Sequence, residues 1–180
     1  MEKRNIIDYY AYWKTDAIKA DMDDKRHNFS VVCVNFGVDF NIGSVIRNAN
    51  AFLAKEVVLL GRKKWDRRGA VGTHNYLNFK HVKTIDDFAT WLKTLTIPHV
   101  VAVDNTPDAT PINEFVWGSH RTHTVMVFGQ EDIGIPEDVK KLCPNTIYIP
   151  QYGSVRSLNV GVASGIAMHE YCRKVVNDTY

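Results

Sequence analysis

The sequence contains few cysteines and no spacing typical of a metal site. Cys33, Cys143 and Cys172 are odd in number and far apart, and none belongs to a C-x-x-C pair. This pattern argues against both a disulfide framework and a zinc site. The seven histidines also lack the H-E-x-x-H spacing of a catalytic zinc helix. We therefore expect buried or half-buried thiols and no bound metal.

A long hydrophobic run is also missing. No apolar stretch approaches the ~20 residues that a membrane-spanning helix needs. The charged first residues are not followed by the apolar segment and small-residue cleavage site of a secretory signal. The hydrophobic fraction of 45% and the charged fraction of 23% over 180 residues are typical of a globular protein with one core. We therefore expect a cytoplasmic protein with no membrane segment.

Positive charge is concentrated in one part of the chain. The net charge is +2, but residues 61–83 hold seven Lys or Arg against the single Asp66, a local balance of +6 that leaves −4 for all other residues. Trp65, Tyr76 and Phe79 are interleaved with these cations. Cations that bind phosphates, together with rings that stack on bases, are typical of a nucleic-acid surface. A solvated basic loop has the same composition, so both interpretations stay open here.

Short apolar runs rich in β-branched residues alternate with helical patterns. Runs that are apolar almost throughout predict strands covered on both faces, at residues 29–35, 56–61, 99–104, 124–129 and 146–150. Helices are predicted between and after them, at residues 41–54, 84–95, 136–143 and 157–176. Thr84 is expected to cap the second of these helices, and Pro136 to be the first residue of the third. The alternation predicts an α/β fold, a three-layer sandwich.

The first residues of the chain differ from this alternating pattern. Apolar and aromatic residues recur near helical spacing before a charged, turn-like stretch that ends at His27, and they are Ile6, Tyr9, Tyr10, Trp13 and Ile18. We therefore predict an N-terminal helical extension over residues 1–27 and a main domain over residues 28–180.

Polar and glycine-rich segments follow four of the predicted strands: NFGVDFNIGSVIRNAN, DNTP, GQEDIGIP and QYGSVRSLN. Ligands of open parallel sheets bind at the carboxyl ends of the strands, so these segments predict a site. The candidate polar residues are Asn35, Asn41, Arg47, Glu131, Ser157 and Asn159. Taken singly, each also has a plain structural role, such as a helix cap for Asn41 or Asn159. A Rossmann dinucleotide site is not supported, because the first turn lacks G-x-G-x-x-G.

With these segments in view, the chain resembles the TrmH-like RNA 2′-O-ribose methyltransferases of the SPOUT superfamily. The resemblance runs from about residue 29 to 171 and rests on three motifs: NFGVDFNIGSVIRNANAF, VFGQEDIGIP and IYIPQYGSVRSLNVGVASGIAMHEY. It implies a mostly parallel sheet whose C-terminal segment forms a deep trefoil knot. It also implies a homodimer that takes a methyl group from S-adenosylmethionine, without a metal, and transfers it to a ribose 2′-hydroxyl of tRNA or rRNA.

The same resemblance implies roles for particular residues. The catalytic positions would be Asn35, Arg47, Glu131, Ser157 and Asn159. The cofactor positions would be Gly129, Ile149, Ser157 and Leu158, with Val103 and Asn105 as further candidates. The basic residues, which the charge pattern rather than the resemblance singles out, would bind the RNA, namely Arg62, Lys63, Lys64, Arg67 and Arg68. Small residues at Gly161, Ala163, Ser164, Gly165 and Ala167 would let the last helix pack closely.

Two alternative functions remain at this stage. A non-catalytic RNA-binding relative is disfavoured, because all five polar catalytic positions are occupied. A base-methylating member of the same superfamily is disfavoured by Arg47 and by the SLN sequence of the third motif.

Overall fold

The computed structural model describes residues 4–37, 41–131 and 133–177. Val38, Asp39, Phe40 and Asp132, which belong to the first two motifs, lie outside the described residues. The strands are β1 (His27–Asn35), β2 (Ala54–Gly61), β3 (Phe79–Val82), β4 (Pro98–Val103), β5 (Thr110–Pro111), β6 (His123–Phe128) and β7 (Asn145–Tyr148). The α-helices are α1 (Thr15–Asp23), α2 (Ile42–Ala51), α3 (Ile85–Leu92), α4 (Glu137–Lys140) and α5 (Val160–Tyr171). There are also three short 3₁₀ helices, η1 (Asp8–Tyr10), η2 (Arg68–Ala70) and η3 (Thr73–Tyr76), and one π-helical turn, η4 (Cys172–Val176).

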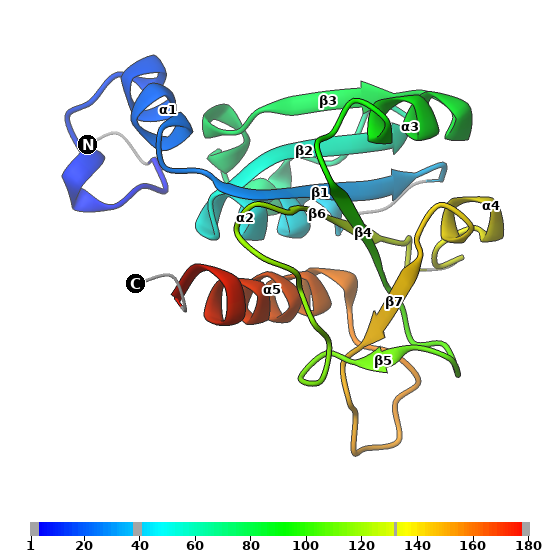
Figure 1. The fold of residues 1–180 in the computed structure, drawn as a ribbon. Helices are drawn as coiled ribbons and strands as arrows, with labels where there is room; N and C mark the ends of the chain where they lie inside the picture. Colours follow the sequence, from blue (N-terminus) through cyan, green and yellow to red (C-terminus); the bar gives the residue numbers. More distant parts are fainter. Residues whose placement is uncertain (1–3, 38–40, 132, 178–180) are drawn as a thin grey trace.

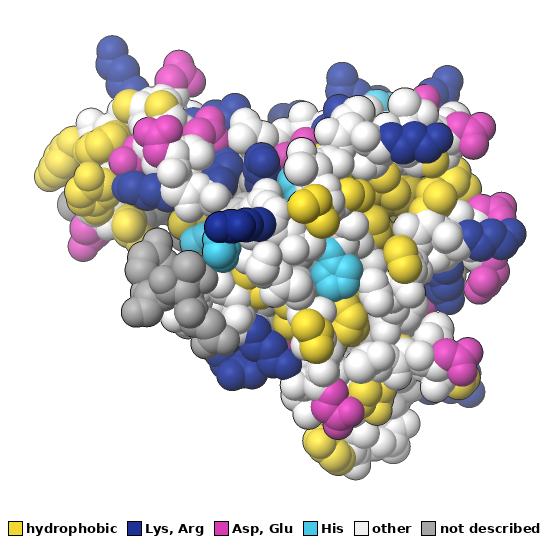
Figure 2. Space-filling model, viewed as in Figure 1, with side chains coloured by type: hydrophobic (Ala, Val, Ile, Leu, Met, Phe, Trp, Pro, Cys, Tyr) yellow, Lys and Arg dark blue, Asp and Glu magenta, His cyan; other side chains and the backbone are white. Residues whose placement is uncertain are grey.

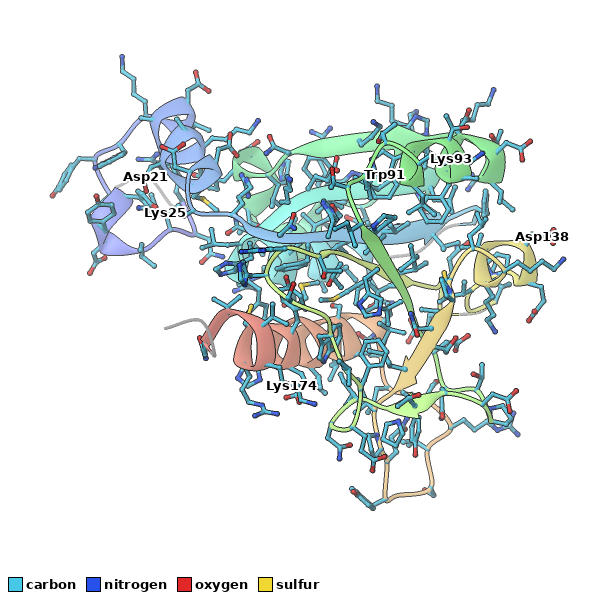
Figure 3. All side chains as sticks on the ribbon, in the orientation of Figure 1. Asp21, Lys25, Trp91, Lys93, Asp138 and Lys174 are labelled. Atoms are coloured by element: carbon cyan, nitrogen blue, oxygen red, sulfur yellow. The ribbon has the colours of Figure 1, made fainter. Side chains whose placement is uncertain are left out.

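The predicted three-layer α/β arrangement is confirmed. All strands pair in parallel in one sheet of order β3-β2-β1-β6-β4-β7-β5. Alternate residues of a strand point to opposite faces, so Val31 packs with α2 and α5, whereas Val32 packs with α3 and α4. Figure 1 shows α5 beneath the sheet, and Figure 3 marks Trp91 of α3, which belongs to the core on the other face. The chain runs outward from β1 to β3 and then crosses to the other side, which creates a topological switch point beside β1.

Two strands were not predicted. In β3, three of the four residues are exposed, so the stretch lacks the apolar run by which the other strands were recognised. The strand β5 has two residues and is too short to give any pattern.

The helix caps agree with the sequence in part. Thr84 forms the predicted cap, as a full capping box with Asp87. Pro136 is wrongly placed by the prediction: it is the N-cap of α4, and its extended ψ of 145° keeps it outside the helix. Asn41 occupies the N-cap of α2, but its side chain makes no cap hydrogen bond. The last helix begins three residues later than predicted, because Asn159 caps it by accepting a hydrogen bond from the Gly161 amide at 2.9 Å.

The N-terminal segment forms a small cluster of its own. Ile18 and Met22 of α1 bury themselves against Tyr76 of η3. Tyr76 is 4% exposed and is therefore unable to stack on a base, which removes it from the aromatic residues suggested for a nucleic-acid surface. Figure 2 shows apolar side chains gathered over this N-terminal segment. Ile7, Tyr9 and Tyr12 of this segment are exposed.

The small residues of α5 allow a close approach to α2. A Cβ atom added at Gly161 would lie 2.8 Å from the Ser44 Cβ, and one added at Gly165 would lie 3.3 Å from the Asn48 Nδ2. Asn48 joins the two helices directly, because its Nδ2 donates to the Gly161 carbonyl at 2.7 Å and to the Ser164 Oγ at 2.9 Å. The packing of these helices therefore needs small residues on α5.

Candidate active site

A cavity of about 210 Å³ lies at the carboxyl ends of β4, β6 and β7, next to the switch point of the sheet. The strand register brings these ends together, because Val103 pairs with both Phe128 and Ile147. We call this space the strand-end cavity. Its lining residues are Val103, Asp104, Asn105, Phe128, Gly129, Gln130, Glu131, Gly134, Ile135, Ile149, Gln151, Ser157, Leu158, Val160 and Ala163.

All six residues expected to bind the cofactor line the strand-end cavity, namely Val103, Asn105, Gly129, Ile149, Ser157 and Leu158. Ile149 and Leu158 are half-buried and provide apolar surface. The side chain of Asn105 donates to the Arg156 carbonyl at 2.9 Å and so fixes the segment that carries Ser157.

The five residues expected to be catalytic lie in three different places. Glu131 and Ser157 line the strand-end cavity. Arg47 and Asn159 line a second groove, between α2 and α5, which we call the α5 groove. Asn35 is buried at the end of β1 and lines neither of them.

Three side chains join the three motifs at one junction. The Asn41 Nδ2 donates to Glu131 Oε2. The Asn159 Nδ2 donates to Asn41 Oδ1 at 2.8 Å and lies 3.4 Å from Glu131 Oε1. This contact explains why Asn41 does not cap its own helix: its side chain binds a carboxylate 90 residues further along the chain. The Asn41–Glu131–Asn159 junction thus holds the start of α2, the segment after β6 and the start of α5 together.

The segment after β6 folds back on itself and forms one wall of the strand-end cavity. Gln130 and Gly134 exchange backbone hydrogen bonds of 3.0 and 2.8 Å. A Cβ atom at Gly129 would lie 2.3 Å from the Gly134 carbonyl carbon, so this turn closes only around a glycine. The buried Gln130 accepts hydrogen bonds from the amides of Phe36 and Gly37, both 3.0 Å, which ties the turn to the end of β1.

Several lining residues were missed by sequence reasoning, and Gln151 is the most informative. Its Oε1 is buried and, among the described residues, has no hydrogen-bond donor. A buried acceptor without a donor is costly unless something else supplies one. Gln151 and Gln130 each lie just beyond a strand end, so the rule that predicted the neighbouring positions would have found them. Asp104, also missed, accepts a hydrogen bond from Lys140 at 2.9 Å, which raises the pKa of that lysine.

Asn35 positions the basic loop that follows β2. Its Nδ2 donates to the carbonyls of Arg62 and Lys64, at 2.7 and 3.0 Å. In the same loop Arg68 binds Asp66 through both charge and hydrogen bonds, and this interaction lowers the pKa of Asp66 to about 2. The one acid of the loop is therefore already neutralised by a neighbour.

The described part of the chain holds no group of three or more His, Cys, Asp or Glu side chains arranged to bind a metal ion. Over the same residues, every helix is too short or too polar to cross a membrane.

The fold and the site together describe an α/β protein with an open parallel sheet. A cavity lies at the switch point of this sheet, next to a basic loop, and a turn around Gly129 closes one side of it. Residues 28–169 match the model of the SpoU rRNA Methylase family, and the chain belongs to that family.

Individual relatives support this assignment. A 23S rRNA (guanosine-2′-O-)-methyltransferase of Acinetobacter baylyi is 29% identical over 139 residues, which cover 74% of this chain and 55% of the relative. The chain thus spans little more than half of that protein. The solved TrmH/SpoU tRNA modifying enzyme of A. aeolicus shares the fold, with a TM-score of 0.77 and 21% identity over 92% of this chain and 84% of the other. The SpoU methyltransferase AviRb of Streptomyces viridochromogenes, solved with the cofactor AdoMet, gives a TM-score of 0.71 and 25% identity over 83% of this chain and 58% of that one.

Proposed function

We propose that this protein transfers a methyl group from S-adenosylmethionine (AdoMet) to a ribose 2′-hydroxyl of a structured RNA, tRNA or rRNA. The observation that carries the proposal is the strand-end cavity at the switch point, which the second and third motifs line and to which Asn41 joins the first motif through Glu131 and Asn159. Family membership supports it, as does the AdoMet in the solved AviRb structure.

The residues of the cavity fit such a cofactor. Ile149 and Leu158 offer apolar surface for a flat adenine ring. The buried Gln151 Oε1, which has no donor among the described residues, would accept a hydrogen bond from an amino group of the cofactor. The turn around Gly129 brings backbone groups close to the same space. AdoMet supplies an electrophilic methyl group on a sulfonium, so no metal is needed to activate it.

The polar residues then have to bind and orient the ribose. Arg47 is exposed in the α5 groove beside Asn159, so it is placed to meet RNA that lies over this groove. A guanidinium keeps its proton up to a pKa above ~12, so we assign Arg47 to the binding of a phosphate or of the developing alkoxide rather than to proton removal. Ser157 would orient the hydroxyl at the mouth of the strand-end cavity, and Glu131 would hold Asn41 and Asn159 in place. Asn35 would act indirectly, by fixing the basic loop.

The test begins with AdoMet binding, measured by calorimetry, for the wild type and for Leu158→Arg. A long cationic side chain at this position would fill the adenine space and abolish binding. Val155→Arg is the matched control: Val155 is 60% exposed and lies in the same segment outside the cavity lining, so its variant should bind like the wild type.

The second step identifies the product by mass spectrometry of nucleosides from RNA treated with enzyme and AdoMet. Ribose-methylated nucleosides are expected. Methylated bases would instead favour the base-methylating alternative. A folded wild type that binds RNA but not AdoMet would favour the non-catalytic one.

The RNA is proposed to lie on the basic loop, at Arg62, Lys63, Lys64, Arg67 and Arg68. Charge reversal at Lys63, Lys64 and Arg67 should weaken RNA binding and reduce its salt dependence. With fewer phosphate contacts, fewer counterions are released from the RNA when it binds. Unchanged affinity and salt dependence would remove the loop from the interface. A tRNA or rRNA substrate would place the reaction in the cytoplasm.

The trefoil knot, the division of the chain after residue 27 and the homodimer also stay proposals. The knot is supported by the course of the chain after β7: it passes from the far side of the sheet to Asn159, which contacts both earlier motifs. Single-molecule stretching in denaturant would test it, because a knotted chain stays shorter than its full contour length.

A further inference from the structure

A basic cleft with an aromatic wall lies next to the strand-end cavity. It measures about 600 Å³ and is lined by Asn35, Gly37, Arg62, Lys63, Lys64, Trp65 and Asp66. We call it the tryptophan cleft. The backbone amide of Gly37, in the wall of the cleft, donates a hydrogen bond to the side chain of Gln130. Gln130 also lines the strand-end cavity. The side chain of Gln130 therefore connects the walls of the two spaces.

Hydrogen bonds hold the cationic wall of the cleft in place. The buried Asn35 amide donates to the carbonyls of Arg62 and Lys64, so the backbone of these residues is fixed from below. The three side chains from Arg62 to Lys64 are exposed. Among the described residues no acid forms an ion pair with them, and Asp66 is held by Arg68 instead. The cleft therefore carries positive charge that is available to a ligand.

The ring of Trp65 forms the other wall and has fixed neighbours. It stacks on Phe79 at a centroid distance of 6.2 Å and an interplanar angle of 18°, and it meets the His74 ring edge-on at 5.6 Å. A second hollow of about 340 Å³ lies against the same indole, lined in part by Arg67 and Lys80. Trp65 is half-buried, so it is fixed in position yet has surface in both spaces.

A rigid indole beside several cations matches the chemistry of an unpaired nucleotide. The base stacks on the ring, and the flanking phosphates bind the cations. A paired base in a duplex cannot present its face in this way. An acidic peptide would use the cations but would leave the ring unused.

We propose that the tryptophan cleft holds one unpaired nucleobase of the RNA, stacked on Trp65, while Arg62, Lys63 and Lys64 bind the neighbouring phosphates. This inference rests on the proposed function and narrows its substrate to RNA that is single-stranded next to the modified ribose. Stacking of a base would also explain why the basic loop contains Trp65.

The test compares two anionic probes on the wild type and on single variants. Oligouridylate offers unstacked bases on a phosphate backbone, whereas inorganic polyphosphate offers phosphates alone. Trp65→Leu should weaken oligouridylate binding about tenfold or more, as expected for the loss of one base–ring stack, and should leave polyphosphate binding unchanged. Lys63→Gln should weaken the binding of both probes. Trp13→Leu is the matched control, since it removes another half-buried indole from the N-terminal cluster and should change neither.

Two results would overturn the inference. One is an equal effect of Trp65→Leu on both probes, or no effect on either. The other needs no variant and covers the case in which Trp65→Leu fails to fold: a wild type whose affinity is unchanged when an oligouridylate with internal abasic sites replaces the intact one. Calorimetry with AdoMet, run on the same protein samples, separates the two proposals. A wild type that binds AdoMet but shows no base-dependent RNA binding counts against the cleft alone. A wild type that shows base-dependent binding but does not bind AdoMet counts against methyl transfer alone.

Discussion

At the scale of single residues, His123 links stability to pH. It is 4% exposed on β6, and its Nε2 lies 2.8 Å from the Ser30 Oγ, which in turn lies 3.5 Å from a Glu56 carboxylate oxygen. Burial, and to a smaller extent Lys55, lowers the pKa of His123 from 6.5 to about 4. The unfolded chain therefore binds a proton in a pH range where the folded one does not.

The sign follows from that difference. Between pH 6.5 and about 4 the unfolded state takes up more protons, so the free energy of unfolding falls as the pH falls, by roughly 3 kcal/mol from this residue. Urea denaturation across this range should show a shallower decline for His123→Gln, which keeps a polar group near Ser30 but does not titrate. Parallel curves for the wild type and the variant would contradict the assignment.

The placement of a residue could be predicted where one segment decides it, and not where a distant segment does. Val103, Ile149 and Leu158 were assigned to the cofactor through the resemblance, and all three line the cavity at or just beyond strand ends. The side chain of Asn41 does not make the predicted cap hydrogen bond, because it binds the carboxylate of Glu131, far along the chain, instead. Tyr76 is an aromatic residue in a basic stretch and so suggested base stacking, but the packing of α1 against η3 buries its ring. No local pattern reports such contacts.

At the scale of elements, the turn after β6 depends on one glycine. In Gly129→Ala the added Cβ would meet the Gly134 backbone at 2.3 Å, and neither segment can move without disturbing the Gln130–Gly134 hydrogen bonds. The variant should lose about 1–3 kcal/mol of unfolding free energy. It should also bind AdoMet more weakly in calorimetry.

Gly153→Ala is the control for this substitution. A Cβ at Gly153 meets no atom within 4 Å, so its stability should stay within about 0.5 kcal/mol of the wild type. A Gly129→Ala protein with wild-type stability and AdoMet affinity would show that the turn tolerates a side chain and does not shape the cavity.

The contact between α2 and α5 depends on Asn48 in a similar way. Asn48→Ala removes both hydrogen bonds to α5 and leaves the Gly161 carbonyl and the fully buried Ser164 with fewer partners. Chemical denaturation should show a loss of about 1–3 kcal/mol. Asn50→Ala, on the same helix, removes a long 3.9 Å contact to the Met22 sulfur and should cost clearly less. Equal costs would mean that the helix pair is held by its apolar packing alone.

Prediction of the elements themselves depended on burial. The strands β1, β2, β4 and β6 were found because most of their residues are buried between the two helical layers and their central runs are almost entirely apolar. The strand β3 lies at an edge of the sheet and exposes most of its residues, so its sequence resembles a loop. The order of the strands could not be read from periodicity at all.

At the scale of the whole molecule, the two faces of α5 have different surroundings. One face carries small residues packed on α2, and beside it lie Val162 and Ile166, which are 53% and 37% exposed. Both line the α5 groove, a space of about 640 Å³ that also contains Arg47 and Asn159. Adjacent exposed apolar side chains are found at interfaces between subunits.

The proposed homodimer would bury this face of α5 against a second copy and would complete the surroundings of Arg47. Ile166→Glu places a charge in that contact and should convert a wild-type dimer into a monomer in analytical ultracentrifugation, because an unpaired buried charge is strongly unfavourable. Val116→Glu is the matched control: Val116 is 79% exposed, lies outside the groove lining, and should leave the dimer intact. A wild type that sediments as a monomer would contradict the homodimer. A dimer that survives Ile166→Glu would place the subunit contact away from α5 and leave Arg47 to act within one chain.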